Sequence, residues 1–268
     1  MTMAIAPGLC SITFRALETD DVLDLAVKAG VEGIEWGADA HVPPGGGAAV
    51  EALAARCRDA GVDVVSYGSY LGMGPPSGDD AAAVDSVLDS VEALGAPMVR
   101  IWTEFGVTPE SPADDRQRVT ERTAVLADAI GARGRIAALE FHPGTLTHTA
   151  ASALELLTTL DRVNLRTHWQ PDPGLAARDA LAELDVVTPW LAHVHTFSWG
   201  PAGIDERRAL ADGLDLWPAA LALAERDGAA LPGRRFALCE YVRDDDPDQF
   251  VDDVRTLRRW LAEAGATT

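Results

Sequence analysis

Four short apolar segments of this chain end in side chains that could bind a metal ion or move a proton. The four terminal residues are Glu140, Gln170, His195 and Glu240. Two carboxylates, one imidazole and one amide oxygen suit a divalent cation, and these residue types alone do not select among Mn2+, Mg2+, Co2+ and Zn2+. Because a buried carboxylate is costly unless it is paired or bound to a metal, the pattern indicates a functional site.

The segment that contains Glu140 shows the pattern most clearly. An apolar run over 136–139 is followed by Glu140 and His142, and Pro143 then ends the segment. Such a run is typical of a parallel strand covered on both faces. Side chains two residues apart point to the same side of a strand, so we expect Glu140 and His142 to face the same way.

The stretches between these segments predict helices with one apolar stripe, each ended by a glycine or a short turn. We expect helices over 19–29, 48–60, 80–94, 112–132, 150–160, 175–184, 216–226 and from Asp246 onward. We expect strands over 4–13, 33–36, 62–67, 98–102, 136–140, 163–170, 191–195 and 235–240. This alternation predicts an α/β fold, a (β/α)8 TIM barrel, as one domain over residues 1–268. An open doubly wound sheet is the alternative, but no phosphate-binding glycine fingerprint follows the first strand.

In a TIM barrel the C-terminal ends of the strands meet at one mouth, so other side chains at these ends are candidates for substrate contacts. These candidates are Glu35, Trp102, His142 and His168. Each has a structural alternative: the glutamate could pair with a barrel arginine, the tryptophan could pack in the core, and the histidines could orient the ligands. We expect His193 to be structural and to lie one layer deeper than His195.

Glu140 and Glu240 are the candidate catalytic bases. Their strands lie three apart around an eight-stranded ring, so their carboxylates should approach the mouth from different sides. Neither has an arginine or lysine adjacent on its own strand face, so we expect both carboxylates to be unpaired and to repel each other unless a cation lies between them. A buried salt bridge with Arg100 or Arg166 is the structural alternative.

The composition argues against several classes of function. A formal net charge of -20 disfavours nucleic acid or an anionic membrane as a partner. The three cysteines are scattered, which indicates neither a disulfide framework nor a zinc ribbon. The single lysine, Lys28, lies near a predicted helix C-terminus, so imine chemistry is not expected. With no secretory leader or membrane-spanning run apparent, we expect a cytoplasmic protein.

Five short motifs, spread over nearly the full length, resemble the xylose isomerase-like TIM barrels, the sugar isomerase and epimerase superfamily. They are Gly33–Trp36 with His41, Ala138–His142, Trp169–Pro171, His193–His195 and Leu238–Glu240. The resemblance implies that one metal ion is bound by Glu140, Gln170, His195 and Glu240. It also implies that the two glutamates move protons and that an arginine after His195, Arg208 or its neighbour Arg207, contacts the substrate.

Gln170 departs from the family pattern, which has Asp at this position. An amide oxygen can still coordinate a metal ion, but the loss of one negative charge should weaken binding, and a relative without metal stays open.

The resemblance leads us to expect a divalent-metal-dependent isomerase or epimerase. It would act on a small sugar, keto sugar or polyol derivative through an enediolate. An inosose-type dehydratase of the same superfamily is the close alternative, and a non-catalytic sugar-binding barrel is another. An apurinic-site endonuclease would need a multi-zinc cluster, and the chain has few histidines in suitable places and an unfavourable charge for DNA. The expected partner is a small sugar molecule, and a homo-oligomer is compatible with the sequence.

Overall fold

Eight parallel strands close into a barrel in this computed structural model, which describes residues 5–76, 80–225, 231 and 233–265. The barrel strands are β1 (Ile5–Cys10), β2 (Gly33–Gly37), β3 (Asp63–Gly68), β4 (Met98–Ile101), β5 (Ile136–Glu140), β6 (Leu165–Trp169), β7 (Leu191–Thr196) and β10 (Arg235–Cys239). Their order around the ring is β1-β10-β7-β6-β5-β4-β3-β2. The predicted (β/α)8 TIM barrel is confirmed.

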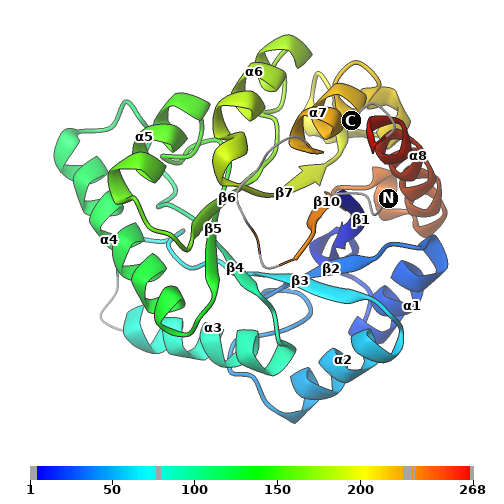
Figure 1. Cartoon of the computed structure of the whole chain (residues 1–268), viewed down its shortest axis with the longest axis horizontal. Helices are drawn as coiled ribbons and strands as arrows, with labels where there is room; N and C mark the ends of the chain where they lie inside the picture. Colours follow the sequence, from blue (N-terminus) through cyan, green and yellow to red (C-terminus); the bar gives the residue numbers. More distant parts are fainter. Residues whose placement is uncertain (1–4, 77–79, 226–230, 232, 266–268) are drawn as a thin grey trace.

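The helices form an outer ring around the strands (Figure 1). They are α1 (Thr19–Ala29), α2 (Ala48–Asp59), α3 (Asp80–Leu94), α4 (Ala113–Ala132), α5 (Ala150–Leu160), α6 (Ala177–Val187), α7 (Trp217–Glu225) and α8 (Pro247–Gly265). The helices pack apolar stripes against the outside of the barrel, where the main apolar core lies. This double cover explains the nearly continuous apolar runs of the strands.

Most predicted boundaries agree with the structure within two residues, and α1, α3 and α5 agree at both ends. The first strand is shorter than predicted because a 3-10 turn, Ser11–Phe14, follows Cys10. Strand β6 begins at Leu165 because Val163 is 93% exposed and does not join the barrel. Helix α6 begins two residues later and ends three residues later than predicted. Two predicted element ends, Ala4 and Arg226, lie outside the described residues.

The sequence did not predict a small antiparallel hairpin that follows β7. Its strands are β8 (Ser198–Gly200) and β9 (Gly203–Arg208). They form a separate two-stranded sheet beside the barrel. The hairpin therefore belongs to the connection between β7 and α7, on the side of the barrel where strand C-termini end.

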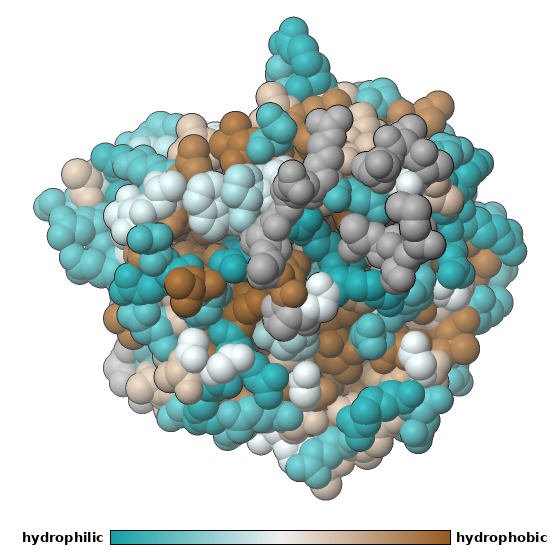
Figure 2. Space-filling model, in the orientation of Figure 1, coloured by the Kyte–Doolittle hydropathy of each residue, from teal (hydrophilic) through white to brown (hydrophobic). Residues whose placement is uncertain are grey.

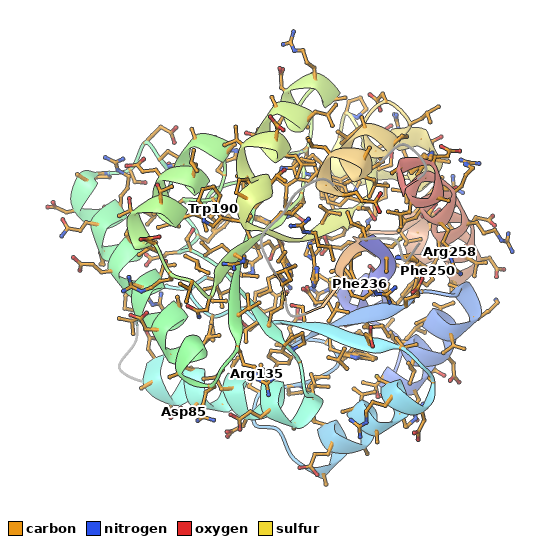
Figure 3. All side chains as sticks on the ribbon, viewed as in Figure 1. Asp85, Arg135, Trp190, Phe236, Phe250 and Arg258 are labelled. Atoms are coloured by element: carbon orange, nitrogen blue, oxygen red, sulfur yellow. The ribbon has the colours of Figure 1, made fainter. Side chains whose placement is uncertain are left out.

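The last helix closes the ring as its sequence predicted. Asp246 Oδ1 accepts a hydrogen bond from the Asp248 N–H at 2.9 Å, which caps the helix start. On the apolar face, the rings of Phe250 and Phe14 lie 5.4 Å apart and edge to face. Figure 3 shows Phe250 of α8 farther from the barrel axis than Phe236 of β10. Helix α8 thus covers the seam where β1 and β10 pair.

Figure 2 shows one face of the molecule, with hydrophilic residues around its periphery and more hydrophobic ones toward its middle. Within the described residues, none of the helices combines the length and apolar character needed to cross a membrane.

Candidate active site at the C-terminal mouth of the barrel

A buried layer of charged side chains fills the barrel just below its C-terminal mouth. Arg100 of β4 lies between two carboxylates: Nε donates at 2.8 Å to Glu35 Oε1 of β2, two strands away in the ring, and Nη1 donates to Glu140 Oε2 of the neighbouring β5. All three side chains are at least nine-tenths buried. The guanidinium fork thus bonds two strands at once.

The expectation that Glu140 is unpaired is therefore wrong. Arg100 pairs with Ala138 in the β4–β5 register, and Glu140 stands two residues farther along the same face of β5. The long arginine side chain reaches across and up to it. The partner lies on the neighbouring strand, so a search along the glutamate's own strand could not find it.

The charges in this layer stabilise one another. Burial alone would raise the pKa of Glu35, but Arg100 and two histidines hold it well below its usual range. Burial opposes the charge of Arg100, yet Glu140 and Glu35 raise its pKa well above the ordinary value. Burial raises the pKa of Glu140, against the opposing effect of Arg100. The layer thus keeps a fixed cation beside Glu140.

Gln170, which follows β6, links Glu140 to the imidazole side of the mouth. Its Nε2 donates to the Phe141 carbonyl at 2.7 Å and lies 3.3 Å from Glu140 Oε1. The carbonyl can only accept, so it fixes which end of the carboxamide is nitrogen. The oxygen Oε1 is consequently turned to His195 Nδ1, 3.2 Å away.

His195 and Glu240 complete this side of the mouth. His195 Nδ1 lies 3.3 Å from Glu240 Oε2, but that buried oxygen accepts no hydrogen bond. Burial would lower the pKa of His195, but Glu240 and Glu35 raise it to about 10. At neutral pH a pKa of this size keeps His195 protonated. A metal ion that binds Nδ1 would have to displace the proton on that nitrogen, as metal ions do at histidine ligands.

The donor atoms on this side fit a divalent cation. Gln170 Oε1, His195 Nδ1 and Glu240 Oε2 are successive neighbours at 3.2 and 3.3 Å, and the glutamate oxygen is a buried anion without a donor. Oxygen and imidazole donors are those that Mn2+, Mg2+, Co2+ or Zn2+ accept. Glu140 stands at the far end of the same chain of contacts, with Arg100 on its other oxygen.

A second cluster of possible ligands lies one layer deeper. Cys10, Glu35 and His195 each place a ligand atom within 4.8 Å of the other two, and among the described residues this is the group of three that meets that distance. Arg100 Nε already donates to Glu35 Oε1 inside the cluster. A metal ion there would face this buried guanidinium, so we favour the upper donors.

Four of the five residues predicted to contact substrate divide into two pairs. Glu35 and His168 are fully buried beneath the mouth, with His168 Nδ1 3.3 Å from Glu35 Oε2. Burial lowers the pKa of His168. Trp102 and His142 lie nearer the rim, where their rings are 4.4 Å apart, and Tyr70 stacks on the other side of the tryptophan at 6.0 Å. The rim pair is the better placed to touch a substrate.

Arg208, the arginine predicted to contact substrate, lies at the end of hairpin strand β9. Arg208 Nε lies 3.2 Å from Glu206 Oε1, and the side chain borders a cavity of about 440 Å3 together with Pro171, Trp199 and Leu216. Its neighbour Arg207 instead donates to Asp245 at 2.5 Å and lies over the ring of Tyr241, 5.7 Å from its centroid. Through Arg207, the hairpin therefore contacts the connection that follows β10.

Two residues of the site were missed as contributors. Tyr241 directly follows Glu240, has a left-handed backbone with φ of 50°, and packs edge-on against Trp199 at 5.2 Å. Arg100 had been considered only as an alternative salt-bridge partner. Its place at the end of a strand, beside Trp102, was the feature that could have drawn attention to it.

A further cavity lies at the other end of the barrel and not at the mouth. It measures about 520 Å3 and is bordered by Val65, Met98, His193 and Phe236. His193 is buried, its Nδ1 accepts the Phe236 N–H at 3.2 Å, and burial lowers its pKa to about 3. These contacts favour the structural role predicted for His193.

Comparisons with known proteins place the chain in a family. A curated relative, the 3-dehydroshikimate dehydratase of Bacillus anthracis, is 24% identical over 205 residues, which is 70% of each protein. A solved L-ribulose 3-epimerase superposes with a TM-score of 0.69 at 17% identity, covering 98% of this chain and 96% of that one. The solved IOLI protein with a bound zinc atom gives 0.71 at 14% identity, covering 97% and 98%. The model of the xylose isomerase-like TIM barrel family matches residues 23–264. The chain therefore belongs to the xylose isomerase-like TIM barrel family.

Proposed function

We propose that this protein is a divalent-metal-dependent isomerase or epimerase that moves a proton at a carbon next to a carbonyl. Its substrate would be a small sugar, keto sugar or polyol derivative. The observation that carries the proposal is Glu240 Oε2, a buried carboxylate oxygen that accepts no hydrogen bond and stands at the strand ends where TIM barrels act. Such an oxygen is available to bind a divalent ion, which would leave the second oxygen of the same carboxylate to take a proton from carbon.

The surrounding residues supply what this step needs. Gln170, His195 and Glu240 would hold the ion, and a bound divalent ion would act as a Lewis acid on the substrate carbonyl. Glu240 would remove the adjacent C–H proton and give an enediolate. His142 and Trp102 at the rim would bind the substrate hydroxyls and ring face. Return of the proton by Glu240 to the neighbouring carbon would exchange aldose and ketose. Inversion of the same carbon would need a second acid, such as Glu140 or a water molecule, to deliver a proton to the opposite face.

The dehydratase remains the second candidate, favoured by the curated Bacillus anthracis relative. Dehydration begins with the same proton removal, and the electron pair then expels a hydroxyl group from the next carbon. His142 would protonate that leaving oxygen, because its ring lies at the rim and is only half-buried. The two reactions therefore share Glu240 and differ in the acid that follows.

One experiment separates these candidates. The metal-stripped protein, supplied with Mn2+, is incubated in D2O with a panel of aldoses, ketoses and inososes, and deuterium uptake at carbon is followed by NMR. A parallel sample receives 3-dehydroshikimate, and an aromatic product is sought by ultraviolet absorbance. Deuterium uptake with an isomeric product supports the proposal, and water loss supports the dehydratase. Binding without exchange in any sample would contradict both and favour a non-catalytic barrel.

A further inference from the structure

The two candidate bases have opposite surroundings. Both oxygens of Glu140 face N–H groups: Arg100 Nη1 donates to Oε2, and Gln170 Nε2 lies 3.3 Å from Oε1. Glu240 Oε2 accepts no hydrogen bond. Glu140, His195 and Glu240 also do not form a group within 4.8 Å, although their contacts through Gln170 connect them. Glu140 is therefore separated from the group of candidate metal donors to which Glu240 belongs.

We propose that Arg100 is a positioning residue that keeps Glu140 out of the metal's donor set, so that Gln170, His195 and Glu240 alone supply side-chain ligands. The inference rests on the proposed function in one respect, that the mouth binds a divalent ion. It assigns Glu140 a role different from that of Glu240. Glu140 is the fixed counter-charge of the Arg100 guanidinium, whereas Glu240 both binds the metal ion and acts as the base.

Arg100 is built into this position. Its Nε is anchored by Glu35, which is fully buried. Its Nη2 lies against Gly68 of β3, where a Cβ atom would come within 2.6 Å of the nitrogen. A planar guanidinium can bond two carboxylates at once, which a lysine ammonium on a flexible stem does less well. Glu140 therefore meets a donor whose place is fixed from two other strands.

Gln170 acts in the same direction. The Phe141 carbonyl accepts from Nε2 at 2.7 Å, so the carboxamide nitrogen is on the Glu140 side and the oxygen is on the His195 side. An aspartate at this position would offer only oxygen atoms. Gln170 and Arg100 together give Glu140 two N–H partners, so its negative charge is compensated without a metal ion.

This arrangement has a consequence for the reaction. Catalytic metal sites keep positions open for water or substrate. With one potential ligand held back, more positions stay open for the carbonyl and hydroxyl oxygens of a substrate. The nearby guanidinium also repels a cation, so the ion should be held loosely.

The test is a double-mutant cycle on Mn2+ binding, measured by titration calorimetry on metal-stripped protein. The variants are Glu140→Gln, Arg100→Met and the two combined. In the wild-type background Glu140→Gln should lower Mn2+ affinity by less than about tenfold, the lower end for groups that only support ligands. Arg100→Met should raise the affinity at least about tenfold, because it removes a repelling charge and frees Glu140.

The proposal is tested by the coupling between the effects of Arg100→Met and Glu140→Gln on Mn2+ affinity. In the Arg100→Met background, Glu140→Gln should cost more than about 100-fold, beyond the range of supporting groups, because Glu140 has become a ligand. Additive effects, or a loss above about 100-fold from Glu140→Gln alone, would overturn the proposal. A purely structural role for Arg100 would lower the unfolding temperature and leave Mn2+ affinity and the coupling unchanged.

Controls keep the outcomes separate. Arg162→Met removes an arginine that pairs with Asp128 at 2.7 Å, in the connection before β6 at the opposite end of the barrel, and it should leave Mn2+ affinity unchanged. If Arg100→Met does not fold, Arg100→Met with Glu35→Gln removes one buried charge of each sign and replaces it in the cycle. If the wild type binds no Mn2+, the metal-dependent function fails. The inference then stands only if the Arg100→Met protein binds Mn2+ through Glu140, and it falls otherwise.

Discussion

The two halves of the barrel interior are filled in opposite ways by the same strands. Near the C-terminal mouth the interior holds Glu35, Arg100 and Glu140. Toward the N-terminal end it holds small and apolar side chains, among them Ala6, Val65, Met98, Ala138 and Phe236. On β4 and β5 the change takes two residues, from Met98 to Arg100 and from Ala138 to Glu140.

The difference shows what each end contributes. The apolar end is close-packed: a Cβ atom on Gly33 would lie 2.4 Å from Val65 Cγ1. The charged end places ionisable groups where desolvation is strong, and it stays folded because these charges have close partners of opposite sign. Even Glu240 Oε2, which accepts no hydrogen bond, lies 3.3 Å from His195 Nδ1. One end is therefore packed for stability and the other holds the candidate site, as in TIM barrels generally.

The largest expected effect comes from Glu240, the carboxylate at the charged end whose Oε2 accepts no hydrogen bond. Glu240→Gln should lower deuterium uptake into substrate by at least about 100-fold, because a general base contributes that much or more. The fold should be retained, since Glu240 Oε2 makes no hydrogen bond to lose. The measurement uses NMR in D2O with both proteins saturated with Mn2+. Glu51→Gln, on the exposed surface of α2, is the matched control, and undiminished uptake in Glu240→Gln would exclude Glu240 from the mechanism.

At the apolar end, Gly33→Ala should reduce stability without changing the chemistry. The added Cβ would also lie 2.6 Å from Phe236 Cε1, and overpacking of this kind costs about 1–3 kcal/mol. Urea unfolding should show the loss, while turnover per folded molecule stays at the wild-type level. Gly74→Ala, where a Cβ has open space, should change stability by less than about 0.5 kcal/mol. Equal losses at the two glycines would contradict this account of the packing.

The contrast between the two ends was only partly predictable from the sequence. The barrel and its strand ends followed from apolar runs, helix stripes and glycine stops, which are local patterns. The Arg100 bridge depends on the register between β4 and β5 and on a gap left by Gly68, and neither is written in any one segment. The direction of the Gln170 carboxamide is likewise set by a backbone carbonyl on another strand.

The hairpin after His195 could have been recognised. Pro201 and Ala202 form a turn between β8 and β9, and a short turn between two strand-like runs is a hairpin pattern. The runs are too short and too polar to stand out, because this sheet packs beside the barrel and not within its apolar layers. The positions of the candidate donors were therefore easier to predict than the loop that borders them.

Gln170→Asp should separate metal affinity from stability. The added negative charge should raise Mn2+ affinity, and the Phe141 carbonyl should lose its N–H donor, which lowers the free energy of unfolding by about 1–3 kcal/mol. Calorimetry and urea unfolding of metal-stripped protein measure the two effects. Gln170→Asn shortens the side chain without adding charge and should not raise affinity. A sharp fall in affinity for the Asp variant would mean that Gln170 is not a metal donor.

The smallest expected effect concerns a buried carboxylate that lacks the partners of the mouth. Asp253 of α8 accepts hydrogen bonds from the Leu210 N–H and from Gln249 Nε2, both at 2.8 Å, and burial raises its pKa to about 6. Glu35, equally buried but beside Arg100, has its pKa lowered instead. Contact with Arg100 and two histidines thus shifts the pKa of Glu35 in the direction opposite to that of Asp253, although both side chains are buried.

Asp253→Asn tests this difference through the pH dependence of stability. The folded protein binds the proton more readily than the unfolded chain, so the stabilising effect of protonation is complete below about pH 4 and is lost as the pH rises to about 6. Asparagine keeps an oxygen for both hydrogen bonds and stays neutral. The variant should therefore exceed the wild type by about 1 kcal/mol or more at pH 7, and the two should converge near pH 4. Urea unfolding across this range measures the difference, and a gap that does not change with pH would show that Asp253 titrates normally.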